Sequence, residues 1–277
     1  MAGLSSTNLT AAMTSAYDDA SASWTTGAGG AYDRLAEVLV AAAPVPLTGA
    51  LVLDLGAGTG AASRAVDAVG GRTVAVDLSL AMLAQDRPRR PAVGSDARAL
   101  PFRDHAFDAV VAAFSLSHLP DPAVGLAEAA RVTRRGGTVL ASAFSAANAL
   151  PGKEAVEKVA ARFGYRRPEW YGRMKTDLEP KVADPGALAA MARSAGLIEV
   201  DVSEHSVDLG TWNPGQLVAW RLSGPSLAGF ARRLSPPLRA EFRAAAEATL
   251  GAEPQAFQPV VLILSSRSGP KRNRPST

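Results

Sequence analysis

The chain is 277 residues long, with 47% hydrophobic and 20% charged residues, which is the composition of an ordinary globular protein. It has no cysteine, so disulfides, thiol catalysis and zinc sites built on sulfur are excluded. Because it also has only three histidines, we expect no metal centre. No apolar run is long enough to predict a transmembrane helix.

The formal net charge is +3, and the basic residues are dispersed except in the stretch 267–277. Arg267, Lys271, Arg272 and Arg274 lie there among Ser, Gly and Pro, so we predict a disordered tail. Without a basic stripe that carries interleaved aromatic residues, we expect no nucleic-acid partner. The first residues have no signal-peptide pattern, so we expect a cytoplasmic protein that does not associate with membranes.

Residues 1–30 are rich in Ser, Thr, Ala and Gly. We predict a flexible lid segment there, made partly of loop or of a loosely held helix. Residues 31–43 place Leu35, Val38 and Leu39 on one face, which predicts a helix.

Short apolar runs alternate with helix-compatible segments from residue 51 onward. The runs lie at 51–55, 73–76, 91–94, 107–114 and 137–143. This alternation predicts a parallel sheet with helices on both faces. Apolar and polar residues then alternate over 198–203, and a last apolar run covers 259–264, which together predict a terminal antiparallel hairpin. The expected fold is therefore α/β and Rossmann-like, with a seven-stranded, mostly parallel sheet.

Two helix starts are marked by an acidic cap followed by proline, at Asp121-Pro122 and Asp184-Pro185. Residues 145–183 interrupt the strand pattern, and a second insert at about 211–250 interrupts the end of the sheet, which we assign to 184–266. We expect the two inserts to form a helical cap over the sheet.

The first strand ends in a glycine-rich turn. Gly56, Gly58 and Gly60 permit a sharp turn and a close approach of the backbone to a ligand, because glycine has no side chain and tolerates positive φ. Asp77 lies 21 positions beyond Gly56, at the end of the next strand, where a carboxylate can accept both hydroxyls of a ribose. These features predict a nucleoside-type ligand, and they fit NAD and S-adenosylmethionine (SAM) equally well.

Four motifs in order then resemble the class I SAM-dependent methyltransferases. They are Leu53–Gly60, Asp77–Leu83, Gly94–Asp104 followed by Phe107–Val110, and Glu128–Gly137. The sequence is similar to the small-molecule methyltransferases of ubiquinone and menaquinone biosynthesis over about residues 30–144, so we expect a SAM-binding core at 31–144. Arg135 is a departure, because the family usually has proline before this glycine pair.

The resemblance implies SAM as the cofactor and S-adenosylhomocysteine as its product. Gly56, Ala57 and Gly58 would approach the methionine part of SAM, and Asp54 would reach its amino group from beneath the loop. Asp77 would hold the ribose hydroxyls.

The resemblance also implies roles around the adenine and the methionine end. Leu78 and Met82 would pack on the adenine faces, and Asp96 and the Ala97 N–H would bind its edge. Four further positions are expected to contact the cofactor, with Phe114 and Ser115 at the methionine end and Tyr17 and Trp24 closing over SAM. For Leu78, Met82, Tyr17 and Trp24, plain packing is the alternative.

The acceptor of the methyl group is less constrained. SAM already carries an activated methyl, so the enzyme mainly aligns the acceptor in line and excludes water. His118 follows the fourth strand, at the sheet edge where ligands bind, and is our candidate base, with a structural role as the alternative. Four aromatic residues of the inserts are candidate contacts for an apolar or aromatic acceptor, although core packing fits them too: Tyr165, Trp170, Tyr171 and Trp212.

The sequence therefore predicts transfer of a methyl group to an O, N or C atom of a small metabolite, by a monomer or homodimer. A SAM-assisted cyclisation or another non-methylating reaction on the same fold stays open. An NAD(P)-dependent oxidoreductase is the third hypothesis, because Tyr171 and Lys175 have the Tyr-x-x-x-Lys spacing, although Gly172 between them weakens it.

Overall fold

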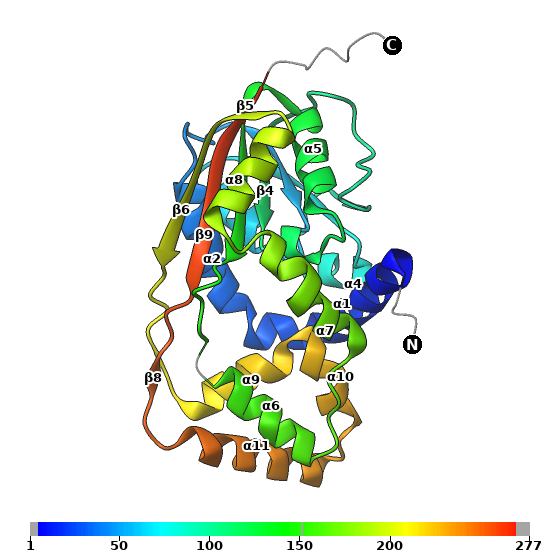
Figure 1. The fold of residues 1–277 in the computed structure, drawn as a ribbon, viewed down its shortest axis with the longest axis vertical. Helices are drawn as coiled ribbons and strands as arrows, with labels where there is room; N and C mark the ends of the chain where they lie inside the picture. The colour runs from blue at the N-terminus through cyan, green and yellow to red at the C-terminus, as the bar shows by residue number, and fades with distance from the viewer. Residues whose placement is uncertain (1–4, 151, 270–277) are drawn as a thin grey trace.

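The computed structural model describes residues 5–150 and 152–269, and within these ranges no helix is long and apolar enough to cross a membrane. Its main feature is a seven-stranded sheet with the order β3-β2-β1-β4-β5-β9-β6 (Figure 1). The strands are β1 (Leu51–Leu55), β2 (Arg72–Asp77), β3 (Ala92–Gly94), β4 (Phe107–Ala113), β5 (Thr133–Phe144), β6 (Leu197–Ser206) and β9 (Val260–Ser268). β9 alone runs antiparallel to the other six strands, so the predicted fold class is confirmed.

Helices cover both faces of this sheet because successive residues of a strand point to opposite sides. On one face, Val52 packs with α2 (Gly29–Ala41) and α3 (Ala61–Ala68). On the other, Leu53 packs with α5 (Pro122–Val132) and α8 (Pro185–Ser194). The latter two helices begin as predicted, since Asp121 and Asp184 accept hydrogen bonds from backbone N–H groups of their first turns.

The two inserts fold into helices that pack on each other, below the sheet in Figure 1. The first contributes α6 (Lys153–Arg162), α7 (Glu169–Arg173), the π-helix η2 (Met174–Leu178) and η3 (Glu179–Lys181). The second contributes α9 (Pro214–Ser223), α10 (Pro225–Arg233) and α11 (Pro236–Leu250), flanked by the short pair β7 (Thr211–Trp212) and β8 (Gln255–Ala256). Val156, Val218 and Phe242 join α6, α9 and α11 in one buried cluster, which we call the cap core.

The N-terminal segment differs from its prediction. Residues expected to be partly loop form one helix, α1 (Ser6–Gly27), which lies between the core and the insert helices (Figure 1). Leu9, Met13 and Ala20 are buried, and α1 packs against α9, α10 and the short α4 (Leu80–Leu83). The length of the helix was not predicted, because its buried face includes small and polar residues and its hydrophobic periodicity is therefore weak.

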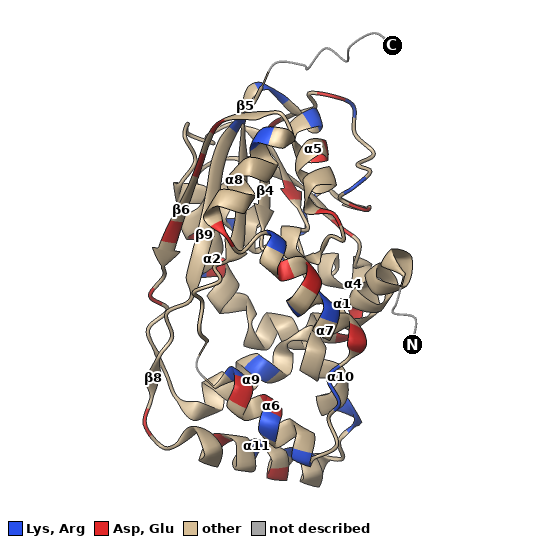
Figure 2. Cartoon of the chain, viewed as in Figure 1, with Lys and Arg blue, Asp and Glu red and all other residues tan. Residues whose placement is uncertain are grey.

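The tail also differs, because β9 continues through Ser268 and includes Arg267. Ser266 is fully buried, and its hydroxyl donates to the Val139 carbonyl, so a polar run takes part in the sheet. The boundary predicted at 267 is therefore wrong. Lys271, Arg272 and Arg274 lie outside the described residues. Figure 2 shows Lys and Arg interspersed with Asp and Glu over both the sheet region and the insert helices.

Candidate functional site

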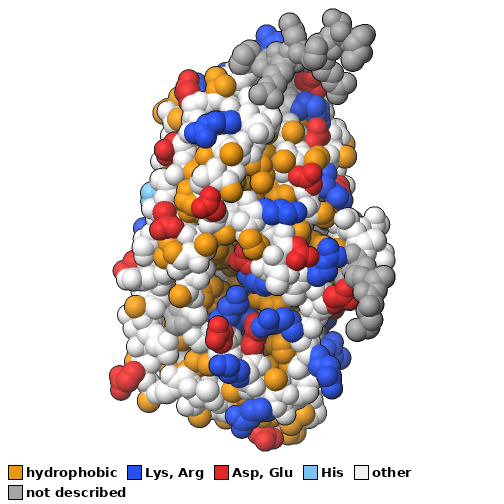
Figure 3. Space-filling model, viewed as in Figure 1, with side chains coloured by type: hydrophobic (Ala, Val, Ile, Leu, Met, Phe, Trp, Pro, Cys, Tyr) orange, Lys and Arg blue, Asp and Glu red, His pale blue; other side chains and the backbone are white. Residues whose placement is uncertain are grey.

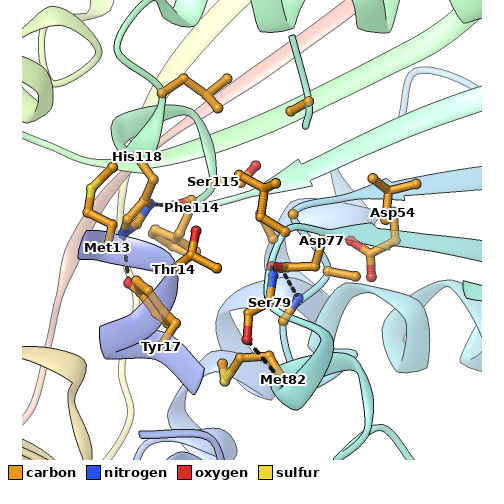
Figure 4. A pocket seen from close by; sticks show the side chains of 18 of the residues that line it. Met13, Thr14, Tyr17, Asp54, Asp77, Ser79, Met82, Phe114, Ser115 and His118 are labelled. Carbon is orange, nitrogen blue, oxygen red and sulfur yellow. Dashed lines mark hydrogen bonds between the residues drawn. The ribbon is translucent and has the colours of Figure 1, made fainter. Parts of the chain in front are cut away.

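A cavity lies at the carboxyl ends of β1, β2 and β4, where ligands bind in sheets of this type. Two walls enclose it. The sheet-edge wall is formed by the loops after β1, β2 and β3 and the residues after β4, and the α1 wall by α1 and the start of α2 (Figure 4). The cavity is therefore formed jointly by the Rossmann-like sheet and by a helix that the sequence predicted only in part.

The glycine turn after β1 depends on its glycines for steric reasons. Gly56 has φ +73°, and a Cβ atom there would lie 2.4 Å from the Cβ of Ser115. Gly60 has φ +84°, and its Cβ would lie 2.1 Å from Oδ1 of Asp86. A side chain at either position would strain the backbone and collide with a neighbour. The turn is thus packed closely against Ser115, which follows β4, and against Asp86, which follows α4.

Asp77, at the end of β2, organises the turn as well as lining the cavity. Its carboxylate oxygens accept hydrogen bonds from the N–H groups of Gly58 and Ser79, each at 2.8 Å. Burial raises the pKa of Asp77. Because a carboxylate has about four acceptor sites, two backbone donors leave room for donors from a ligand.

Asp54 lies beneath the turn and carries an unused acceptor. Its Oδ2 accepts from the N–H (2.9 Å) and the hydroxyl (2.7 Å) of Ser63, whereas its Oδ1 is buried and has no partner. Burial raises the pKa of Asp54 to about 6. A buried carboxylate oxygen that lacks a donor costs free energy, so a cationic donor group in the cavity would satisfy it. The amino group of SAM has the chemistry that this atom lacks.

Asp96, in the turn after β3, is already paired. Its carboxylate contacts Nε (3.0 Å) and Nη2 (2.6 Å) of Arg98, and this hydrogen bonding lowers the pKa of Asp96. Both residues line the cavity, together with Ala97. Arg98 was not predicted as a site residue, although its place two positions after Asp96 was visible in the sequence.

The two residues predicted on the adenine faces, Leu78 and Met82, differ in exposure. Met82 is 3% exposed and Leu78 is 39% exposed, and both line the cavity. Leu78 is therefore available on the open side of the cavity, whereas Met82 is part of its floor.

The residues after β4 meet the α1 wall at an aromatic cluster. Phe114 has φ +56°, and its ring contacts that of Tyr32 edge-on, at 5.5 Å between centroids. Tyr32 in turn lies 4.8 Å from the ring of Trp24, which lies 6.0 Å from that of Tyr17. All four rings line the cavity, and Ser115 lines it beside them. Tyr32 was not predicted as a site residue. Its helix was predicted, but nothing in the sequence around Tyr32 indicated contact with a ligand.

His118, in the short helix η1 (Leu116–His118), lines the same cavity. Its Nε2 lies 2.7 Å from the hydroxyl of Tyr17, and its Nδ1 lies 3.1 Å from the carbonyl oxygen of Phe114 (Figure 4). Burial lowers the pKa of His118. The structure thus joins the predicted base to a residue that was predicted only as a cofactor contact.

The four aromatic residues predicted to contact the acceptor lie in packed regions instead of lining this cavity. Tyr165 belongs to the cap core, and Trp212 stacks on Phe257 at 4.2 Å. Trp170 and Tyr171 pack behind Met13, whose side chain lines the cavity. Lys175 lies 5.8 Å from the ring centre of Tyr171 and pairs with Glu179, and neither member of the Tyr-x-x-x-Lys spacing lines the cavity.

The outer surface of the insert helices is open on one face. Figure 3 shows the surface hollowed between the segment of α7 and η2 and the helices α6 and α9, with hydrophobic side chains visible inside and charged side chains around it.

Within the described ranges, no group of three or more His, Asp or Glu side chains is arranged to hold a metal ion.

Comparison with known proteins identifies the central part of the chain. Residues 53–141 match the family model of a methyltransferase domain. A demethylmenaquinone methyltransferase of Renibacterium salmoninarum is 43% identical over 110 residues, which are 39% of this chain and 46% of that protein. The chain thus spans about half the length of the curated relatives that it matches. The predicted resemblance to class I SAM-dependent methyltransferases similar to the quinone-biosynthesis enzymes is confirmed for this domain.

Solved structures extend the fold likeness to most of the chain. A phosphoethanolamine N-methyltransferase of Haemonchus contortus, in complex with S-adenosylhomocysteine, has a TM-score of 0.53 at 18% identity, covering 85% of this chain and 52% of that one. The [4+2]-cyclase SpnF has a TM-score of 0.51 at 21% identity, covering 86% and 81%. At these identities the likeness shows the fold alone, and this fold is shared by a methyltransferase and a cyclase. The methyltransferase domain implies SAM as its methyl donor.

Proposed function

We propose that the chain is a SAM-dependent methyltransferase that modifies a small, apolar or aromatic acceptor. One observation carries the proposal: the glycine turn and the carboxylates of Asp54, Asp77 and Asp96 line a single cavity within the matched methyltransferase domain. The unpaired buried Oδ1 of Asp54 fits the amino group of SAM. A wholly apolar ligand in this cavity would leave the same oxygen without a hydrogen-bond donor.

The residues of the sheet-edge wall are proposed to bind SAM. Asp77 holds the ribose hydroxyls, and the backbone of Gly56, Ala57 and Gly58 approaches the methionine part. The adenine lies between Leu78 and Met82, with Asp96 and the Ala97 N–H at its edge. When bound, SAM supplies a methyl group activated by its sulfonium. The chain orients the acceptor towards that methyl and excludes water, with Phe114 and Ser115 at the methionine end.

The α1 wall is proposed to receive the acceptor and to act as a lid. Met13, Trp24 and Tyr32 present apolar and aromatic surface to the cavity, and Phe114 contacts Tyr32 from the sheet-edge wall, which suits a flat, apolar molecule. Trp170 and Tyr171 support this wall from behind Met13. Since the matched relative acts on demethylmenaquinone, a reduced naphthoquinone is our first acceptor class. For acceptors that must lose a proton, His118 is the proposed base.

We further propose that the protein works in the cytoplasm, as a monomer or homodimer, on a small molecule and not on nucleic acid. The interspersed charges support the last point, because nucleic-acid binding surfaces concentrate basic residues (Figure 2).

Calorimetric titration with SAM, S-adenosylhomocysteine and NAD tests the cofactor. We expect binding of the first two and none of NAD, and binding of NAD alone would overturn the proposal. Incubation with SAM and a reduced naphthoquinone, followed by mass spectrometry, tests the reaction. A gain of one methyl group is expected. Conversion of a polyene substrate without a gain in mass, with SAM bound but intact, would indicate the cyclase alternative instead.

A further inference from the structure

Tyr17 and His118 are 101 positions apart in the chain, yet their polar atoms meet inside the cavity. The Tyr17 hydroxyl lies 2.7 Å from Nε2 of His118, and the two rings meet edge-on with their centroids 5.3 Å apart. Figure 4 shows the side chain of Tyr17 pointing from α1 to His118, with a dashed line between the two. The contact therefore links the α1 wall directly to the candidate base.

Hydrogen-bond logic assigns the protons in this pair. The Phe114 carbonyl can only accept, so Nδ1 of His118, 3.1 Å away, must carry the hydrogen. In a neutral imidazole the other nitrogen is then an acceptor, and burial lowers the pKa of His118, which favours the neutral form. Nε2 therefore accepts, and the Tyr17 hydroxyl donates. Ser117 lies 3.4 Å from Nδ1, a longer contact that leaves this assignment unchanged.

Both ring nitrogens of His118 are consequently engaged, and its basic atom is covered by Tyr17. A hydroxyl has one donor and two acceptor sites, so Tyr17 keeps acceptor capacity after donating to Nε2. Tyr17 itself lines the cavity, next to Met13 and Thr14. An acceptor in the cavity can therefore reach the hydroxyl oxygen of Tyr17 without breaking the hydrogen bond to His118.

We propose that Tyr17 receives the proton of the acceptor and at the same time passes its own proton to His118, so that the two residues act as a proton relay. The proposal rests on the proposed methyl-transfer function. It assigns Tyr17 as the catalytic residue that touches the acceptor and His118 as the residue that holds the proton. This role of Tyr17 differs from the role expected from the sequence, which was contact with the cofactor.

The relay balances in atoms and charge. The X–H bond of the acceptor breaks, its electron pair forms the new bond to the methyl carbon, and its proton goes to the Tyr17 oxygen. The bond between the methyl carbon and the sulfonium sulfur breaks at the same time, and its electron pair stays on the sulfur, which becomes neutral. The former hydroxyl proton of Tyr17 goes to Nε2 of His118, so Tyr17 ends neutral. The positive charge that leaves the sulfonium with the methyl group reappears on the His118 imidazolium.

The charged groups around the pair act on the proton of His118 in opposite directions. Burial raises the pKa of Tyr17 well above its ordinary value, which opposes a free phenolate and favours concerted transfer. The charged groups around His118 are Lys175 and Glu179, which form an ion pair next to it on η2 and η3. Around Tyr17 lie Tyr32, Asp77, Tyr171 and again Glu179. Glu179 is thus the charged group common to both members of the pair, and it favours the imidazolium, whereas Lys175 opposes the imidazolium more strongly.

Nuclear magnetic resonance of ¹⁵N-labelled histidine tests the pair without an acceptor, and with three histidines the signals can be assigned by substitution. We expect His118 in the Nδ1–H tautomer, with a pKa below 6.5, the ordinary value. Tyr17→Phe removes only the hydroxyl, so it should raise the pKa of His118 by about half a unit to one unit, because the neutral form loses a hydrogen bond. Tyr165→Phe, a matched change at a buried tyrosine outside the cavity, should leave it unchanged.

Kinetics with a reduced naphthoquinone then test the relay. Tyr17→Phe should lower kcat by roughly 100-fold or more with KM and SAM affinity nearly unchanged. His118→Phe should cost about as much, and the double variant no more than either, because the residues act as a unit. An unchanged His118 pKa in Tyr17→Phe, or a loss of SAM affinity of about tenfold, would overturn the relay. Failure of the wild type to bind SAM would instead overturn the proposed function. The resonance experiment does not depend on SAM binding, so the two failures can be told apart.

Discussion

The two walls of the cavity are built in different ways. Each part of the sheet-edge wall follows directly from a strand end, and its key contacts join neighbouring loops, such as that between Asp77 and Gly58. The α1 wall instead depends on docking over long distances in the chain. Asp18 of α1 accepts from Ser79 of the core, and Asp19 pairs with Arg232 of α10. The comparison indicates that the sheet-edge wall is formed by local geometry, whereas the α1 wall forms only when core and insert helices are both in place.

The largest expected effect concerns the sheet-edge wall. Asp77→Ala should weaken SAM binding by at least 100-fold, because two charge-assisted hydrogen bonds to the ribose are each worth about 1.5–3 kcal/mol. Titration calorimetry measures this. Asp18→Ala is a matched control, since Asp18 hydrogen-bonds the neighbouring Ser79 but does not line the cavity, and it should change the affinity less than threefold. Equal losses in both variants would contradict the division into two walls.

The next effect concerns the turn itself. Gly56→Ala should lower the free energy of unfolding by about 2–4 kcal/mol, because the positive φ and the contact with Ser115 both oppose a methyl group. Gly30→Ala is the control, since a Cβ there meets nothing within 4 Å. It lies in α2 and should be neutral or stabilising by up to about 1 kcal/mol. Denaturant unfolding of both variants measures the difference, and equal stabilities would show that the turn is not tightly held.

Asp54 should make stability depend on pH in an unusual direction. Burial raises its pKa from 3.8 to about 6, so between these values the folded protein keeps a proton that the unfolded chain has lost. This contribution to stability is present below about pH 4 and is lost as the pH rises through about 6. Asp54→Asn cannot ionise, so its unfolding free energy should gain about 2–3 kcal/mol relative to wild type between about pH 4 and pH 7.

Urea unfolding at several pH values measures this difference, and parallel pH profiles of the two proteins would contradict it. The SAM affinity of Asp54→Asn should change in the opposite sense to its stability. The same substitution should weaken SAM binding at about pH 7, because the charged partner of the amino group is lost. A variant that is more stable but binds SAM less well would sharpen the comparison, since it would show a sheet-edge residue kept for binding at the expense of folding.

The smallest effect concerns the docking of α1. A Cβ at Gly27 would lie 2.5 Å from that of Ser223 in α9, so Gly27→Ala should separate α1 from the insert helices. The overpacking costs about 1–3 kcal/mol and the better helix propensity of alanine offsets part of it, leaving a net loss of about 1 kcal/mol. Limited proteolysis should cut α1 faster than in Gly30→Ala. Unchanged cleavage would show that α1 does not need the insert helices.

The same difference explains how far the sequence could predict the molecule. The seven-stranded, mostly parallel sheet, the glycine turn and Asp77 followed from apolar runs and from short-range motifs, which leave a clear pattern. Tyr17 and His118 were both selected, but their contact was not, because they lie 101 positions apart in the chain and only the docking of α1 brings them together. Trp212 was assigned to the acceptor because an aromatic residue looks the same in sequence whether it faces a ligand or, as here, stacks on Phe257.

The position of β9 in the sheet bears on how the chain is made. This strand lies between β5 and β6, so β6 has no neighbour in the main sheet until residues 260–268 are available. During synthesis, α9, α10 and α11 leave the ribosome before β9 does, because they precede it in the chain. The insert helices can therefore assemble on each other while the sheet is still incomplete. The addition of β9 between β5 and β6 then completes the sheet.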